Sequence, residues 1–149
     1  MTPYHKIQTI FKRDPATNHK TLLFGDYSLP ELEYLRNNQW RFDEKIDGTN
    51  IRIIYTVIEG RGTIRFAGKS DNAVIPGFLL ERLSERFPDT GRFEEQFGDT
   101  SVCLYGEGFG ARIQKGGGNY ISNGVDFCLF DVRIGHFWLK REDVAGIAR

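Results

Sequence analysis

Residues 51 to 68 read IRIIYTVIEGRGTIRFAG, and they indicate the class of the fold. The β-branched run over residues 51 to 58 alternates loosely between apolar and polar side chains, which is typical of a strand. The turn residues EGRG follow at 59 to 62, and a second strand-like run occupies residues 63 to 68. This order predicts a β-hairpin in the middle of the chain.

A short helix is expected before the hairpin, over residues 28 to 37, SLPELEYLRN. Ser28 has a side chain suited to the N-cap, and Pro30 fits the first turn, where a missing backbone N–H costs nothing. Leu32 and Leu35 are spaced to share one face. We therefore expect this helix to be buried through its two leucines.

After the hairpin the pattern returns to helical spacing and then to strands. Residues 76 to 87, PGFLLERLSERF, predict a helix, and Phe93 with Phe97 predict a second helical segment. Strand-like segments follow at 101 to 108, 125 to 134 and 136 to 140, and a helix begins in 141 to 149. Strands paired through hairpins and flanked by helices predict an α+β fold with a mainly antiparallel sheet.

The composition is that of one globular domain spanning residues 1 to 149. The chain is 40% apolar and 27% charged, and no apolar run reaches the length of about eighteen residues that a membrane span needs. Twenty basic and twenty acidic residues cancel, so any surface that attracts phosphates must be local. The N-terminus lacks a secretory signal, and a cytoplasmic location is expected.

The cysteines and histidines give no sign of a metal site. Cys103 and Cys128 lie in apolar, strand-like runs and are expected to be small buried side chains. His5, His19 and His136 share no ligand-like spacing. The sequence therefore leaves any metal ligands unassigned.

The stretch that indicates chemistry is EKIDGTN, residues 44 to 50. Lys45 is followed by an acid, a glycine and a turn between two strand-like segments, a place from which a lysine can point into a cleft. To act as a nucleophile it must lose a proton whose unperturbed pKa is about 10.4, which desolvation or nearby cations would favour. Gly48 allows close backbone approach to a phosphate. The alternative is a hairpin turn in which Lys45 is a solvated surface charge.

This stretch resembles the active-site motif of the covalent nucleotidyltransferases, and among them of the phage-type ATP-dependent RNA ligases. Lys45 matches the family's adenylated lysine, Glu44 precedes it, and Asn50 closes the pattern KxDGxN. DNA ligases and capping enzymes share the lysine motif but usually carry arginine at the position of Asn50. The resemblance therefore favours the RNA ligases and keeps the DNA ligase or capping-type enzymes as an alternative.

Further motifs extend the resemblance along the chain in the family's order. The sequence LYGE ends in Glu107, which matches the glutamate that contacts the ribose, and LFD contains Phe130, which matches the aromatic residue that stacks on adenine. The sequence AGKS places Lys69 where these ligases carry a basic residue near the phosphates. Glu44, Lys45, Asn50, Lys69, Glu107 and Phe130 are thus the expected nucleotide-binding residues, with Lys45 catalytic.

Each assignment also has a physical reason and a plainer alternative. A carboxylate at Glu107 can accept hydrogen bonds from both ribose hydroxyls, and the glycines beside it are expected to leave room for the sugar. Phe130 offers adenine a stacking platform, and Lys69 would offset charge on the phosphates. Taken singly, Phe130 could be core packing, Glu107 a strand-end acid, and Lys69 and Arg65 solvated charges.

The resemblance implies a nucleotidyltransferase domain, with the ATP-grasp-like fold of ligase adenylation domains, that uses ATP and Mg²⁺. It implies that Lys45 attacks the α-phosphorus of ATP, that the AMP passes to an RNA 5′-phosphate, and that an RNA 3′-hydroxyl then displaces AMP. Strand sealing of this kind serves RNA repair. A family of phage type points to the cytoplasm of a bacterium or of a phage-infected host.

The chain departs from the family after its third motif. Motifs I, III and IIIa are present, whereas motif IV, whose acid serves the metal, and motif V, with its paired lysines, are not found before Arg149. We therefore expect a C-terminally truncated domain, and little self-adenylation by residues 1 to 149 alone. A non-catalytic fragment that binds nucleotide or nucleic acid is a further alternative.

A glycine-rich stretch lies between the second and third of these motifs. Gly116, Gly117 and Gly118 predict a mobile loop. Arg112 and Lys115 beside them either contact RNA phosphates or are solvated, and the sequence leaves both readings open.

Overall fold

The computed structural model describes residues 2 to 148, which form two compact units. One unit holds the residues up to Tyr4 together with the chain from Lys45 onward, and the other is His5–Glu44. All the motifs singled out above lie in the first unit except Glu44, which ends the second.

The unit His5–Glu44 contains a small hairpin that the sequence did not predict. Strands β1 (Phe11–Arg13) and β2 (Leu22–Tyr27) pair antiparallel, and a short 3₁₀ helix, η1 (Pro15–Thr17), lies between them. The Asp14 side chain caps this turn by accepting the Ala16 N–H at 2.8 Å. The strands are short and largely exposed, so no alternation of apolar residues marked them.

The expected helix near residue 30 forms, but with a different cap. Helix α1 spans Pro30–Tyr34 and begins after Leu29, without a side-chain cap. Ser28, predicted as the N-cap, instead donates a hydrogen bond from its hydroxyl to the Thr9 carbonyl. Its side chain therefore links the two ends of the hairpin and does not cap the helix. The predicted buried leucine face is also wrong, because Leu35 is 36% exposed in this small unit.

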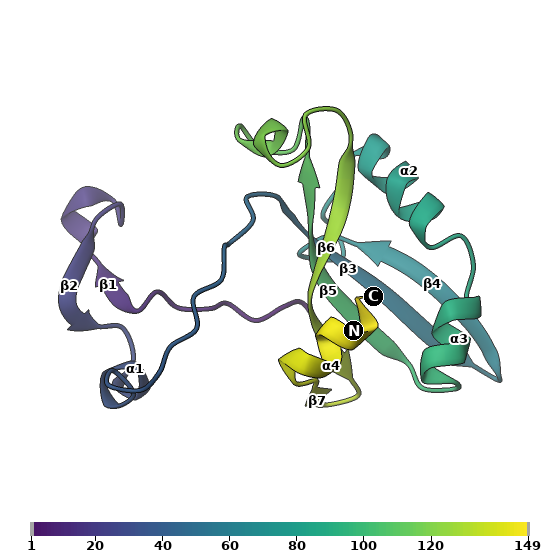
Figure 1. The fold of residues 1–149 in the computed structure, drawn as a ribbon, viewed down its shortest axis with the longest axis horizontal. Coiled ribbons are helices and arrows are strands. Elements are labelled where there is room, and N and C mark those ends of the chain that lie inside the picture. Colours follow the sequence, from purple (N-terminus) through teal and green to yellow (C-terminus); the bar gives the residue numbers. More distant parts are fainter. Residues whose placement is uncertain (1, 149) are drawn as a thin grey trace. The chain divides into compact units, whose positions relative to one another are not determined.

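The larger unit is built on a five-stranded antiparallel sheet, and the predicted central hairpin is confirmed. Its strand order is β4-β3-β5-β6-β7, which Figure 1 shows with the long strands side by side. Ile53 of β3 pairs with Phe66 on one side and with Leu104 on the other. The strands are β3 (Thr49–Ile58), β4 (Arg61–Ala67), β5 (Val102–Gly110), β6 (Val125–Ile134) and β7 (Phe137–Trp138).

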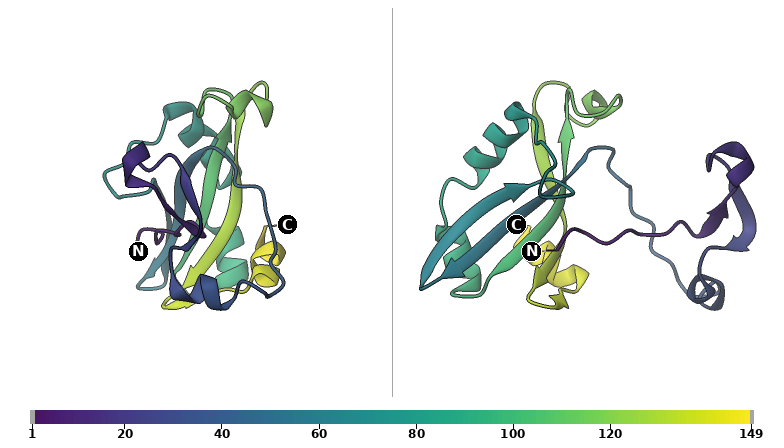
Figure 2. Two further views of the ribbon diagram at one scale, coloured as in Figure 1. Left: turned by 90° about the vertical axis from the view of Figure 1, so that its left-hand side faces the viewer. Right: turned by 180° about the vertical axis from the view of Figure 1, so that it is seen from behind.

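Helices pack on one face of this sheet (Figures 1 and 2). The predicted helices after the hairpin are confirmed as α2 (Gly77–Arg86) and α3 (Gly91–Phe97). The last helix, α4, spans Arg141–Ile147, and Arg149 lies outside the described residues. The α+β class with a mainly antiparallel sheet is therefore confirmed.

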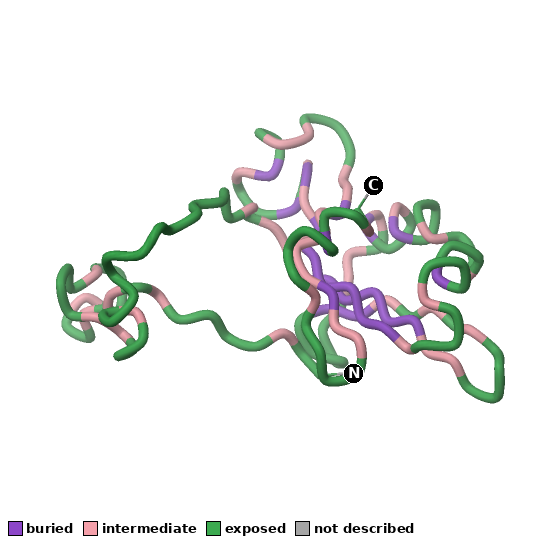
Figure 3. Tube along the Cα trace, turned by 60° about the horizontal axis from the view of Figure 1, so that its bottom comes forward, coloured by how far each residue is buried: buried purple, intermediate pink, exposed green. Residues whose placement is uncertain are grey.

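The main core lies between the helices and this face, and it appears as the buried strand segments in Figure 3. Every second residue of a strand points to the same side, which places Ile51, Ile53 and Tyr55 together. Helix α2 contributes Leu79 and Leu83, both fully buried. Burying a side chain of this size contributes about 1.5–3 kcal/mol, so these contacts hold helix and sheet together.

The opposite face of the sheet carries a smaller buried cluster: Ile54, Ala67, Cys103 and Tyr105, with Tyr4 and Phe130 packed against it. We call this side of the sheet the second face. Aromatic rings meet on it, since the centroid of the Tyr4 ring lies 5.3 Å from that of Tyr105, 5.0 Å from that of Phe130 and 5.4 Å from that of Trp138. Cys103 is buried as predicted, whereas Cys128 is only half-buried.

Strand β6 changes its facing at a bulge. Tyr105 pairs with Asp131 while the next residue, Gly106, pairs with Leu129, so Phe130 is the extra residue. Leu129 and Val132 both pack on the helix-covered core, although they are three positions apart. The bulge thus leaves Phe130 on the second face.

Candidate functional site

Lys45 lies in an irregular segment immediately before β3. Residues 41 to 47 form no strand. The motif was expected to join two strand-like segments, and the one expected before it is absent. The hydrogen-bonded ladder begins at Thr49, which pairs with Gly108 of β5. The Lys45 side chain is exposed, and Lys45 comes four residues before the first residue of β3.

The structure brings the lysine motif against Glu107. A Cβ added to Gly48 would lie 2.8 Å from the Cγ of Glu107 and would also clash with the Gly108 carbonyl oxygen. Gly48 is therefore required for the close approach of its backbone to Glu107 and to β5.

Asn50 lies directly opposite Glu107 in the β3–β5 ladder, so the two side chains share the second face. Its Oδ1 atom is buried and accepts no hydrogen bond from the described residues. Leaving a buried polar atom unpaired costs about 1–3 kcal/mol. A partner supplied from outside the described residues would remove this cost.

Burial raises the pKa of the Glu107 carboxyl above its usual value. The positive charge of Lys45 and the Gly48 N–H act in the opposite direction without cancelling the effect of burial, and the charge of Asp47 adds to it. Glu107 is thus a half-buried acid within electrostatic range of Lys45, which is an arrangement that functional sites often show.

The glycines beside Glu107 serve the core rather than the second face. A Cβ on Gly106 would clash with the Phe127 ring, and one on Gly108 would lie 2.5 Å from Leu79. Both contacts lie on the helix-covered side of the sheet. The expectation that these glycines leave room for a sugar is therefore wrong, because the space they leave is already filled.

Phe130 is half-buried on the second face. The Tyr4 ring meets it edge to face, with ring planes at 74°, and the Tyr4 hydroxyl donates to Asp131 at 3.0 Å. Phe130 therefore packs against protein while part of its surface stays accessible, and both readings of this residue retain support.

Lys69 is exposed and follows the end of β4, at the same end of the sheet as Asn50. Its neighbour Gly68 is held by Arg52, whose Nε donates to the Gly68 carbonyl at 2.8 Å. Arg52 is fully buried and also pairs with Asp71 at 2.8 Å. Sequence reasoning missed Arg52, although an arginine inside an apolar strand was the available signal.

The loop between β5 and β6 makes two hydrogen bonds to the segment that carries Lys45. The Asp47 N–H donates to the Tyr120 hydroxyl at 3.2 Å, and the Gln114 side-chain amide donates to the Gly48 carbonyl at 3.0 Å. Neither Gln114 nor Tyr120 was singled out from the sequence, because no local pattern reveals a partner 66 or more positions away. These contacts make the loop part of the site.

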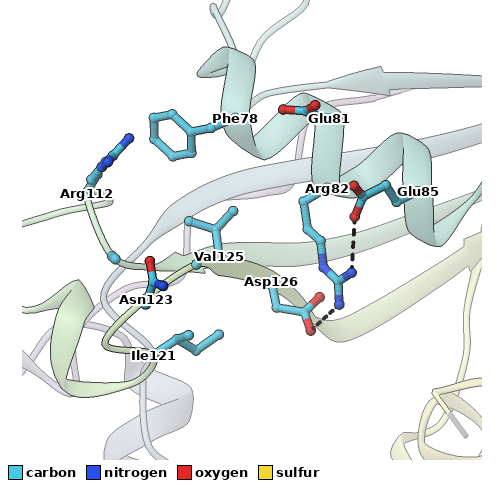
Figure 4. Close-up of a pocket in the computed structure, with 11 residues that line it drawn as sticks. Phe78, Glu81, Arg82, Glu85, Arg112, Ile121, Asn123, Val125 and Asp126 are labelled. Atoms are coloured by element: carbon cyan, nitrogen blue, oxygen red, sulfur yellow. Dashed lines mark hydrogen bonds and ion pairs between the residues drawn. The ribbon is translucent and has the colours of Figure 1, made fainter.

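Lys45, Asn50, Lys69 and Glu107 thus gather at one end of the sheet, and Phe130 lies farther along the second face. Glu44, which ends the other unit, is exposed. A groove of about 520 Å³ lies elsewhere, between α2 and the segment leading into β6 (Figure 4). Phe78, Arg112 and Asp126 line it, and none of the six expected nucleotide-binding residues does.

Two further observations concern residues 2 to 148. No group of three or more His, Cys, Asp or Glu side chains there is arranged to hold a metal ion. No helix in that range has the length and apolar character needed to cross a membrane.

Known structures share this fold. The RNA ligase of Naegleria gruberi with pyrophosphate is 22% identical to the chain, with a TM-score of 0.51. Two mutants of that ligase with AMP and manganese are each 20% identical, again with a TM-score of 0.51. No protein-family model and no curated protein matches the chain.

Each match covers 69% of this chain and 29% of the ligase. The chain therefore spans less than a third of the length of the structures it matches. At this level of identity the likeness establishes the fold that the sequence led us to expect.

Proposed function

We propose that this protein is an ATP-dependent RNA ligase of the phage type, in which Lys45 carries AMP as a covalent lysyl-adenylate. The observation that carries the proposal is the contact between two motifs 59 positions apart, where Gly48 packs directly against the Glu107 side chain. A lysine, a half-buried carboxylate and an unpaired buried amide oxygen then lie together on a fold found in RNA ligases.

The roles of the nucleotide-binding residues follow from their chemistry. Glu107 accepts hydrogen bonds from the ribose hydroxyls, and the unpaired Oδ1 of Asn50 accepts a further one. Phe130 stacks on adenine through its accessible surface. Lys69 offsets negative charge near the phosphates, and Glu44, which precedes Lys45, completes the proposed set of nucleotide-binding residues.

The reaction proceeds in three steps. The neutral amine of Lys45 attacks the α-phosphorus of ATP, and pyrophosphate leaves as the phosphoramide bond forms. The AMP then passes to an RNA 5′-phosphate, and an RNA 3′-hydroxyl displaces it to join the strands. The location we propose for this activity is the cytoplasm of a bacterium or of a phage-infected host.

Magnesium is the proposed divalent cation. Proteins commonly bind Mg²⁺ through one or two carboxylates together with substrate phosphates, and not through a cage of side chains. Bound there, it neutralises charge on the phosphates of ATP.

The test uses the product of the complete gene with Mg²⁺ and ATP labelled at the α-phosphate. We expect an acid-labile label on Lys45 that is absent from Lys45→Ala and Lys45→Arg. Lys20→Ala, an exposed lysine outside the proposed nucleotide-binding residues, is the matched lysine control and should be labelled like the wild type. A label on another lysine, or an undiminished label in Lys45→Ala, would contradict the proposal.

A further inference from the structure

The Tyr120 hydroxyl accepts a hydrogen bond from the Asp47 N–H, in the segment that carries Lys45. Several contacts within the loop between β5 and β6 hold Tyr120 in place. The Ala111 N–H donates to the Gly124 carbonyl at 2.8 Å and closes the base of the loop. Ile113 is buried in the main core. The Tyr120 ring packs edge to face on Phe109, with centroids 5.9 Å apart.

One glycine of the glycine-rich part of this loop is closely packed, and backbone hydrogen bonds join the residues beside it. Gly117 is buried, and a Cβ on it would clash with the Gly110 carbonyl. The Asn119 N–H donates to the Gly116 carbonyl at 3.0 Å within the 3₁₀ turn η2 (Gly117–Asn119). Gly117 thus allows close packing of this turn, and the mobility expected of the loop stays a prediction.

The loop also places two residues in left-handed backbone conformations. Arg112 has φ +68° and Gln114 has φ +56°. Non-glycine residues adopt such angles at a cost of about 1–3 kcal/mol when the surroundings enforce them. Gln114 uses this geometry to direct its amide to the Gly48 carbonyl.

The two hydrogen bonds hold the peptide groups on either side of the Asp47–Gly48 pair, two residues beyond Lys45. We infer that Tyr120, with Gln114 as a second hold, is a positioning residue that fixes the segment carrying Lys45 relative to Glu107. This inference rests on the proposed function for its catalytic consequence. Misplacing a reacting group by about 1 Å can cost on the order of a hundredfold in rate.

The decisive variant is Tyr120→Phe, which keeps the ring on Phe109 and removes only the hydroxyl. In the product of the complete gene we expect faster amide hydrogen exchange over residues 45 to 49. We also expect a roughly tenfold slower self-adenylation at saturating ATP, with the KM for ATP unchanged. Tyr34→Phe, whose tyrosine is 87% exposed, is the matched control and should alter neither measurement.

Gln114→Glu is the second variant, because it replaces the amide donor with an acceptor facing the Gly48 carbonyl. It should raise exchange over the same residues and slow adenylation in the same way. Unchanged exchange in both variants, or faster exchange with an unchanged adenylation rate, would overturn the inference. Absence of labelling in the wild type would contradict the proposed function instead, and exchange would still decide whether the two side chains hold the segment.

Discussion

The two faces of the five-stranded sheet are made by the same strands but differ in chemistry. The helix-covered face is apolar, with Ile51 and Ile53 of β3 packed against α2. The second face carries Asn50 and Arg52 from the same strand and Glu107 from its neighbour. Alternation along β3 therefore separates residues that stabilise the fold from residues that we propose bind nucleotide.

This separation predicts two different responses to mutation. Substitutions on the helix-covered face should lower the free energy of unfolding and leave the nucleotide affinity of the folded protein unchanged. Substitutions of Asn50 or Glu107 on the second face should do the reverse. Arg52 and the buried cluster of Ile54, Ala67, Cys103 and Tyr105 lie on the same face but are buried, so their substitution should also lower the free energy of unfolding.

The largest expected effect is that of Leu83→Ala on the helix-covered face. Leu83 is fully buried, so its truncation should lower the free energy of unfolding by about 2–5 kcal/mol in a denaturant titration. Leu80→Ala, on the same helix but 41% exposed, should change it by about 0.5 kcal/mol or less. A Leu83→Ala protein that folds stably but no longer binds ATP would break the division between the faces.

An intermediate effect is expected from Phe130→Ala on the second face. Loss of a stacking platform should weaken ATP binding by about 1–3 kcal/mol, which is roughly 5- to 150-fold in Kd. Phe130→Tyr and Phe130→Trp should largely preserve it, and calorimetry measures all three. If Phe130→Ala unfolds the protein while its folded fraction binds ATP normally, the ring serves packing alone.

The smallest effect concerns pH and Glu107. Because burial raises the pKa of this carboxyl in the folded state, its contribution to stability is fully present below the ordinary value of 4.5. That contribution is lost as the pH rises through the folded pKa. The Tm of Glu107→Gln minus that of the wild type should therefore increase as the pH rises from 4 to 7.

Thermal unfolding at both pH values measures this gain. The exposed Glu81→Gln serves as the control and should show a Tm difference that does not vary with pH. A gain for Glu107→Gln that is larger at pH 4 than at pH 7 would reverse the assigned direction.

Strong local patterns in the sequence predicted the larger unit well. The hairpin of β3 and β4 and the helix α2 were recognisable because their apolar residues recur with the period of a strand or a helix. The hairpin of β1 and β2 was missed because its strands are short and largely exposed. Ser28 was misassigned because its hydroxyl bonds to Thr9, which is distant in sequence.

The site was predictable only where its residues belong to a motif. Lys45, Asn50 and Glu107 were singled out in that way, and the structure places them at one end of the sheet. Tyr120 and Gln114 contact the same segment through hydrogen bonds that no local periodicity encodes. Their identification required the three-dimensional structure, as did the partners of Arg52.

The bulge in β6 acts as a change of phase within one strand. Before it, odd-numbered residues such as Phe127 face the core, and after it even-numbered residues such as Val132 do. Deleting Phe130 would place Leu129 and Val132 two positions apart, so strict alternation would keep both Phe127 and Val132 on the helix-covered face. The inserted residue therefore adds the proposed adenine platform to the second face without changing which side chains face the core, so its deletion should remove the platform and spare the core.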